Sequence, residues 1–214
     1  MKRKYRVVRQ ILRTLFHLLS DLEVEGLEHI PEEGAGILAT NHISRLDTPL
    51  LGAVCPRRVT GMVALEYRDY PLFRWVLGAA EPIWVRRSEF DREALLESIR
   101  VLRRGGFLGL APEGTRSPDG TLQQGKHGVA FLAARAKVPI VPVGISGTDR
   151  MVERFRKLRR MQIRVVFGEP FHLPQEGRLN PEELAAATEI IMLGIARLLP
   201  PERRGVYAHR VEAE

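Results

Sequence analysis

The stretch GAGILATNHISRLDTPLLGA, residues 34 to 53, holds the pattern that decides the fold of this 214-residue chain. Its first part, residues 34 to 40, is a continuous apolar run of the kind found in strands that are buried on both faces. A helical pattern follows near residues 48 to 54, and the polar pair Asn41 and His42 lies on the loop between strand and helix. Open α/β sheets bind ligands at the carboxyl ends of their strands. The stretch therefore predicts a functional loop on an α/β scaffold.

The rest of the chain repeats this alternation of short apolar strands and helices. Strand patterns cover residues 34–40, 58–65, 82–86, 106–111, 139–146 and 162–168. Helical patterns lie near residues 48–54, 69–78, 91–104, 126–137 and 181–199. The alternation predicts an α/β fold in which a largely buried sheet, mixed or parallel, is flanked by helices. We expect one domain over residues 21–214, preceded by an amphipathic helix within residues 1–20.

The composition indicates an anionic partner. The chain contains 28 Arg and 5 Lys, and its formal net charge is +7. Arginine suits phosphate, so the charge fits nucleic acid, a membrane surface, or a phosphorylated or CoA-like ligand. The single cysteine, Cys55, excludes an intramolecular disulfide and a multi-cysteine metal site. The sequence shows no run of 18 apolar residues and no signal peptide, so we expect an intracellular protein that does not span a bilayer.

His42 and Asp47 form the first candidate catalytic pair. A regular helix would hold them on different faces, but a loop that runs into a helix can bring them together. Ser44 with Asp47 resembles a capping box, and Thr48 with Pro49 offers an alternative helix start. A carboxylate bonded to one imidazole nitrogen leaves the other nitrogen free as a general base. Taken alone, the motif fits a helix-start histidine bonded to local backbone better than it fits a catalytic one.

Three further segments place polar or special residues at strand ends. The loop APEGTRSPDG, residues 111 to 120, combines a glycine that lets a ligand approach the backbone with an arginine that can grip a phosphate. The segment IWVRRS, residues 83 to 88, ends a strand in two arginines. The segment VPIVPVGI, residues 138 to 145, contains two prolines, which suits an edge strand, a bulge or the lining of a pocket. Separately, the first two also fit an ordinary polar loop and a solvated edge.

Together, and in this order, these segments resemble the glycerolipid acyltransferase family, most closely its lysophosphatidic acid acyltransferases. The family's first block, N-H-x-S-x-x-D, is matched at Asn41, His42, Ser44 and Asp47. The third block, P-E-G-T-R-S, is complete over residues 112 to 117, and the fourth, V-P-I-V-P-V, is complete over residues 138 to 143. The resemblance runs from about residue 24 to residue 168.

The second block of the family is matched with one departure. Its I-x-V-x-R pattern is found at Ile83, Val85 and Arg87, but Glu81 stands where glycine is usual. The K-x-G pattern that tends to follow the third block is found at Lys126 and Gly128.

The resemblance implies transfer of an acyl chain from acyl-CoA or an acyl carrier protein to the sn-2 hydroxyl of lysophosphatidic acid, which makes phosphatidic acid for phospholipid biosynthesis. His42, oriented by Asp47, would be the general base. The other matched residues would bind substrate: Asn41, Ser44, Arg87, Glu113, Gly114, Thr115, Arg116 and Lys126. The three basic ones would hold phosphate, and Glu113 would orient Arg116 or bond the glycerol hydroxyl. No metal and no cofactor beyond the acyl donor is expected, because a thioester is already activated.

Other functions fit part of the sequence. The acceptor could instead be another lysolipid or glycerol-3-phosphate. A basic nucleic-acid-binding module would fit the charge, but it predicts more exposed aromatics than a 7% aromatic content supplies and leaves the ordered blocks unexplained. A hydrolase could use a His-Asp pair, yet the G-x-S-x-G pattern of a serine nucleophile is missing. We therefore expect an acyl donor and a lysophospholipid as partners, and no nucleic acid.

The first 19 residues, MKRKYRVVRQILRTLFHLL, predict a basic amphipathic helix. They contain six Lys or Arg and no acid. The apolar residues fall on one predicted face, with Phe16 at its border: Val7, Val8, Ile11, Leu12, Leu15, Leu18 and Leu19. Such a helix either lies in a membrane interface or packs on the sheet with its arginines in water. With a lipid acceptor, we expect a peripheral or monotopic protein at the cytoplasmic face of the membrane. The basic segment 150 to 164 would add to this surface or lie near the CoA phosphates.

Overall fold

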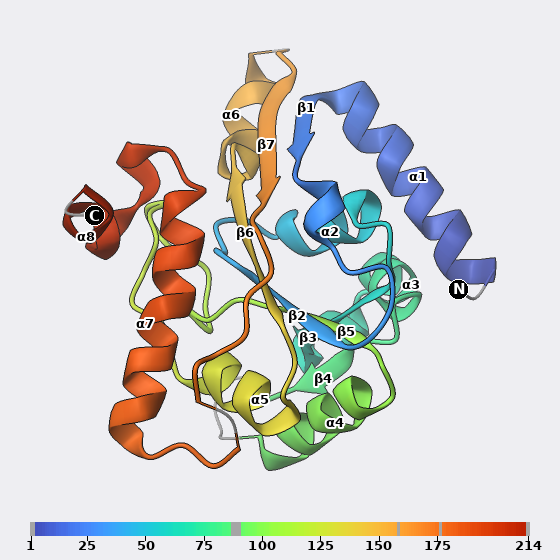
Figure 1. Cartoon of the computed structure of the whole chain (residues 1–214). Helices are drawn as coiled ribbons and strands as arrows, with labels where there is room; N and C mark the ends of the chain where they lie inside the picture. Colours follow the sequence, from blue (N-terminus) through green and yellow to red (C-terminus); the bar gives the residue numbers. More distant parts are fainter. Residues whose placement is uncertain (1–2, 87–90, 158, 176, 213–214) are drawn as a thin grey trace.

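The computed structural model describes residues 3–86, 91–157, 159–175 and 177–212, which form one seven-stranded sheet flanked by helices (Figure 1). The strand order is β1-β7-β6-β2-β5-β3-β4. The strands are β1 (Ser20–Glu25), β2 (Gly36–Thr40), β3 (Val59–Ala64), β4 (Ile83–Val85), β5 (Phe107–Leu110), β6 (Ile140–Ser146) and β7 (Met161–Phe167). Strands β2 to β6 are parallel to one another, β7 is antiparallel to β6, and β1 is parallel to β7. The sheet is therefore mixed, with its parallel part at the centre.

Helices cover both faces of this sheet. They are α1 (Arg3–Leu19), α2 (Asp47–Val54), α3 (Pro71–Gly78), α4 (Arg92–Arg103), α5 (Gly128–Ala136), α6 (Met151–Arg156), α7 (Pro181–Arg197) and α8 (Ala208–Glu212). Short 3-10 turns cover Leu27–His29, Leu65–Asp69, Thr148–Arg150, Pro201–Arg203 and Gly205–Tyr207. Helices α4, α5 and α7 pack on one face, whereas α1 and α2 pack on the other, with α3 against α1 (Figure 1).

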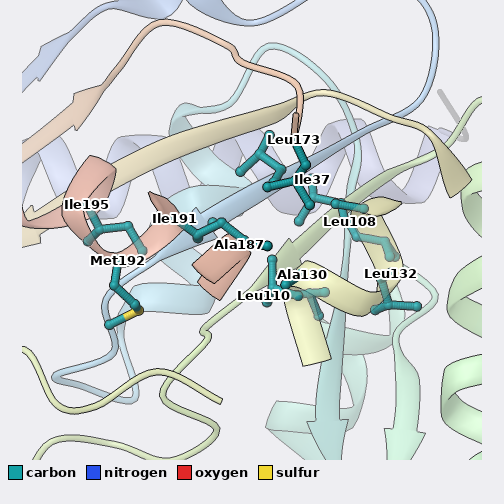
Figure 2. Packing of buried hydrophobic residues seen from close by; sticks show 14 of the residues in the cluster. Ile37, Leu108, Leu110, Ala130, Leu132, Leu173, Ala187, Ile191, Met192 and Ile195 are labelled. Carbon is teal, nitrogen blue, oxygen red and sulfur yellow. The ribbon is translucent and has the colours of Figure 1, made fainter. Parts of the chain in front are cut away.

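Strand β2 shows why the centre of the sheet is apolar on both sides. Ile37 and Ala39 belong to the core shared with α5 and α7, whereas Leu38 between them packs on the opposite face with α2. Figure 2 shows the first of these cores, in which Ile37 and Leu108 lie close to side chains of α5 and α7 such as Ile191. All five residues of β2 are buried. A central parallel strand needs this continuous apolar run, so the prediction for this segment is confirmed.

The predicted elements agree closely with the structure. All six predicted strands and all five predicted helices are present, with ends shifted by one or two residues. Strand β1, with the sequence SDLEVE, was not predicted, because an edge strand with alternating exposure lacks the apolar run of the central strands. Helix α6 was also missed, because it is short and lies inside the basic segment 150 to 164.

The start of α2 differs from the prediction at Thr48. The helix begins one residue earlier, at Asp47, and its N-cap residue, Leu46, makes no side-chain capping bond. Half of the expected capping box is present, because Oδ2 of Asp47 accepts a hydrogen bond from the Ser44 N–H. The carboxylate is therefore tied to the loop that precedes its own helix.

Helix α1 has two apolar faces instead of the single predicted face. Tyr5, Val8 and Phe16 are buried against the rest of the protein. The outer face carries four apolar side chains that are 43% to 67% exposed: Val7, Ile11, Leu15 and Leu18. Within the described residues, no helix combines the length and apolar character that crossing a membrane requires. The division into residues 1–20 and 21–214 stays a prediction, although α1 does end at Leu19.

Candidate active site

The His42–Asp47 pair forms where the chain leaves β2 and turns into α2. Nδ1 of His42 lies 2.8 Å from Oδ2 of Asp47. The same oxygen accepts hydrogen bonds from the backbone N–H groups of Ile43 and Ser44, each at 2.8 Å. The Asp47 side chain is 2% exposed, whereas that of His42 is 25% exposed. Because a carboxylate only accepts, Nδ1 carries the hydrogen and Nε2 is left as the basic nitrogen.

Asn41 ties the end of β2 to β6. Its Nδ2 donates to the Ile145 carbonyl and its Oδ1 accepts from the Ile145 N–H, both at 2.8 Å. Ser44 bonds to the backbone close by, since its Oγ accepts a hydrogen bond from the Leu46 N–H at 3.2 Å. Both side chains bond to the protein's own backbone, and the substrate contacts expected for these two residues stay predictions.

Glu113 holds the backbone of His42 in place. Its Oε1 accepts the His42 N–H at 2.7 Å, and its Oε2 accepts the Gln123 N–H at 2.9 Å. The carbonyl of His42 in turn accepts the Ser117 N–H at 2.7 Å, so the P-E-G-T-R-S loop bonds to both sides of this residue. Burial raises the pKa of the Glu113 carboxyl, while the two N–H donors act in the opposite direction. Each carboxylate oxygen therefore accepts one backbone amide, and the expected contact with Arg116 or with the glycerol hydroxyl stays a prediction.

His42 and Asp47 line a cavity of about 850 Å³. Part of its lining is apolar and comes from α1, α2, β3 and α3: Val8, Leu12, Leu51, Val63, Val76 and Leu77. Another part is polar and comes mainly from the loops after β5 and before α5: Thr115, Arg116, Lys126 and His127. The cavity thus joins an apolar space to a basic one beside the imidazole. This combination suits a molecule with an acyl chain at one end and an anionic group at the other.

Arg116 lines the cavity without an acidic partner among the described residues. Two nearby carboxylates that could have paired with it are engaged elsewhere. Glu113 binds the two backbone amides, and Asp119 accepts from Ser117, Thr121 and Gln123. The guanidinium is therefore available to a ligand.

Gly114 allows Lys126 to lie across the same loop. Its φ is +69°, in the left-handed region that favours glycine. A Cβ at this position would lie 3.1 Å from Cδ of Lys126, tighter than most side chains tolerate. The glycine thus brings a second cation to the basic side of the cavity that Arg116 lines.

Comparison with known proteins agrees with this geometry. A family model described as "Acyltransferase" matches residues 21–146, more than half of the chain. The chain belongs to the acyltransferase family. Among curated relatives, the 1-acyl-sn-glycerol-3-phosphate acyltransferase of Bacillus subtilis is 25% identical over 196 residues, which are 91% of this chain and 96% of the relative. The protein of the same name from Pseudomonas aeruginosa is 27% identical and covers 85% of this chain and 72% of its own length.

A solved structure also matches this chain. The crystal structure of the 1-acyl-sn-glycerophosphate (LPA) acyltransferase PlsC from Thermotoga maritima superposes with a TM-score of 0.71 at 28% identity. The match covers 91% of this chain and 79% of the other. The α/β fold expected from the sequence is therefore confirmed for this acyltransferase.

The structure also shows residues in or beside the site to which the sequence assigned no role. Arg86 lines the cavity beside the end of β4, whereas the predicted Arg87 lies outside the described residues. His127 lines it too, with Nδ1 3.0 Å from Oγ1 of Thr188. Thr148 donates a hydrogen bond to Oδ1 of Asp47 at 2.7 Å. Its position, 101 residues away from Asp47, gives no signal in the sequence.

Proposed function

We propose that this acyltransferase moves an acyl chain from a thioester to the sn-2 hydroxyl of 1-acyl-glycerol-3-phosphate, producing phosphatidic acid. The observation that carries the proposal is the arrangement in one cavity of the oriented His42–Asp47 pair, an apolar lining and Arg116, which has no acidic partner in the part of the chain that the structure describes. The relatives from Bacillus subtilis and Pseudomonas aeruginosa are named for this reaction. Among the described residues, no cluster of His, Cys, Asp or Glu is placed to bind a metal ion.

His42 supplies the proton transfer. Its Nε2 takes the proton of the acceptor hydroxyl as the oxygen attacks the thioester carbonyl carbon. The tetrahedral intermediate then collapses, the C–S bond breaks, and the imidazolium returns the proton to the departing thiolate. Asp47 stabilises the imidazolium and fixes the tautomer throughout.

The remaining predicted residues divide into two groups. Arg116 and Lys126 bind the acceptor phosphate, because an arginine fork and an ammonium in a partly enclosed cavity form charge-assisted hydrogen bonds to it. Asn41 and Glu113 act on the protein instead, since Asn41 anchors the chain just before the catalytic histidine to Ile145 and Glu113 accepts the N–H of the histidine itself. The apolar part of the cavity accommodates an acyl chain.

A substrate panel tests the reaction. Thiol release is measured from acyl-CoA and from acyl carrier protein thioesters, with lysophosphatidate, glycerol-3-phosphate or lysophosphatidylcholine as acceptor, and the lipid product is identified by mass spectrometry. We expect release that depends on lysophosphatidate and yields phosphatidate. Equal release without any acceptor would indicate a hydrolase, and acylation of glycerol-3-phosphate alone would reassign the acceptor.

The outer face of α1 provides the membrane contact in this proposal. Its exposed apolar stripe is flanked by basic residues, and these make two separate contributions to binding, apolar burial and attraction to anionic lipid. The inner face of the same helix lines the cavity through Tyr5, Val8, Arg9 and Leu12. When the outer face of α1 binds the bilayer, this helix therefore lies between the bilayer and an acceptor that is bound in the cavity. Location at the cytoplasmic face stays a prediction.

Vesicle binding tests this contact. The double variant Ile11→Gln with Leu15→Gln should bind phosphatidylglycerol vesicles more weakly than the parent protein, and salt should weaken binding of the parent. Gln10→Ser, on the exposed polar side of the same helix, is the matched control and should bind normally. Unchanged binding of the double variant would place the membrane contact on another part of the protein.

A further inference from the structure

Thr148 completes the hydrogen bonding of the Asp47 carboxylate. Oδ2 of Asp47 receives three donors, from the His42 ring and from two backbone amides. Oδ1 receives the Thr148 hydroxyl at 2.7 Å. Thr148 is fully buried and is absent from the cavity lining, so it contacts the carboxylate and not the substrate space.

The backbone beyond β6 is shaped to present this hydroxyl. Gly147 has a φ of +89°, and a Cβ there would collide with the backbone carbonyl of Gln162. On the other side of Thr148, Asp149 forms an ion pair with Arg203 at 2.9 Å, and both side chains are largely buried. Arg203 also donates to the Gly120 carbonyl at 3.0 Å. Thr148 is thus held between a turn that only glycine fits and an anchored ion pair.

We propose that Thr148 is a positioning residue of the catalytic pair. A buried carboxylate oxygen without a donor is costly, and rotation of the carboxylate about its Cβ–Cγ bond can relieve that cost by moving the oxygen toward other donors. The Thr148 hydroxyl satisfies that oxygen. Oδ2 therefore stays directed at the His42 ring. The inference rests on the proposed role of His42 as general base.

A purely space-filling role for Thr148 predicts a different order of activity among its variants. Valine has nearly the same shape and lacks the hydroxyl, whereas serine keeps the hydroxyl and loses a methyl group. If Thr148 only fills space, Thr148→Val is silent and Thr148→Ser is the weaker enzyme. If it positions Asp47, the order is reversed.

The experiment is steady-state kinetics of the full chain with Thr148→Val, Thr148→Ala and Thr148→Ser. We expect kcat to fall about tenfold or more in Thr148→Val, because a hydrogen bond to a buried charge is lost, with both KM values within about twofold. Thr148→Ser should retain most of the activity. Thr60→Val, which removes the hydroxyl of another buried threonine, in β3, is the matched control and should leave kcat unchanged.

A double-mutant cycle with Asp47→Asn shows whether the effect acts through the carboxylate. Thr148→Val should have little further effect in the Asp47→Asn background. A full, independent loss in that background would overturn the proposal, as would a folded Thr148→Val enzyme with normal kcat, or failure of both Thr148→Val and Thr148→Ala to fold. Appreciable activity in His42→Ala would refute the proposed mechanism itself, so the two failures are distinguishable.

Discussion

The polar groups in the loop from Asn41 to Asp47 and those on the basic side of the cavity differ in their bonding partners. In the loop, the side chains of Asn41 and Asp47 are satisfied by the protein, and Glu113 and Ser117 bind the His42 backbone. On the basic side, Arg116 faces the cavity without an acidic partner among the described residues. The first arrangement fixes a reacting group before substrate arrives, and the second leaves charge for the substrate to neutralise. Substitutions in the loop should therefore reduce kcat, and those on the basic side should raise KM.

The largest effect is expected from His42→Ala. Loss of the general base should lower kcat by about 10²- to 10⁴-fold while thermal unfolding stays close to that of the parent. Asp47→Asn should be severe but milder, because it disturbs the tautomer and orientation and leaves the imidazole present. His209→Ala, at an exposed histidine of α8, is the control. Near-normal turnover of folded His42→Ala would contradict the distinction between a catalytic loop, which sets kcat, and a basic side, which sets KM.

Glu113→Gln should give the next largest effect. The amide nitrogen cannot accept an N–H, so one of the two backbone bonds is lost and kcat should fall roughly tenfold. The KM for lysophosphatidate should change by less than about threefold. The opposite split, a raised acceptor KM with normal kcat, would assign Glu113 to acceptor binding, as the sequence indicated.

Arg116→Ala should change KM, whereas the previous substitutions change kcat. Loss of a bidentate contact to phosphate should raise the apparent KM for lysophosphatidate at least about tenfold, with little change in that for the thioester. Arg116→Lys keeps the charge without the fork, so it should recover part of the loss. Arg103→Ala, at an exposed arginine of α4, is the control. An unchanged acceptor KM in folded Arg116→Ala would require another cation to hold the phosphate.

Cys55 should contribute least. The thiol follows α2, is fully buried, and has its pKa raised by burial to about 11. Native protein at pH 8 should therefore react with a thiol reagent such as DTNB only after unfolding, and Cys55→Ser should retain turnover. Ping-pong kinetics, or inactivation of a folded Cys55→Ser enzyme, would instead indicate transfer through a covalent intermediate.

The sequence pattern predicted the structural features that depend on residues close together in the chain. The apolar run of β2 and the meeting of His42 with Asp47 follow from burial and from a short loop, and both are confirmed. The Thr148 contact depends on how β6 lies beside β2, which spacing along the chain does not encode. The use of Glu113 as a backbone acceptor follows from the same packing of distant loops. The substrate contacts expected for Arg116 and Lys126 stay predictions.

The bond between Asn41 and Ile145 joins the catalytic loop to β6 in the centre of the sheet, and this has a consequence for heat inactivation. A loop held only by its own short turns can open on its own, well below the temperature at which a domain melts. Here the loop cannot leave its place without breaking two buried bonds to a central strand. Loss of activity on heating should therefore coincide with cooperative melting of the sheet, without an earlier inactive but folded state.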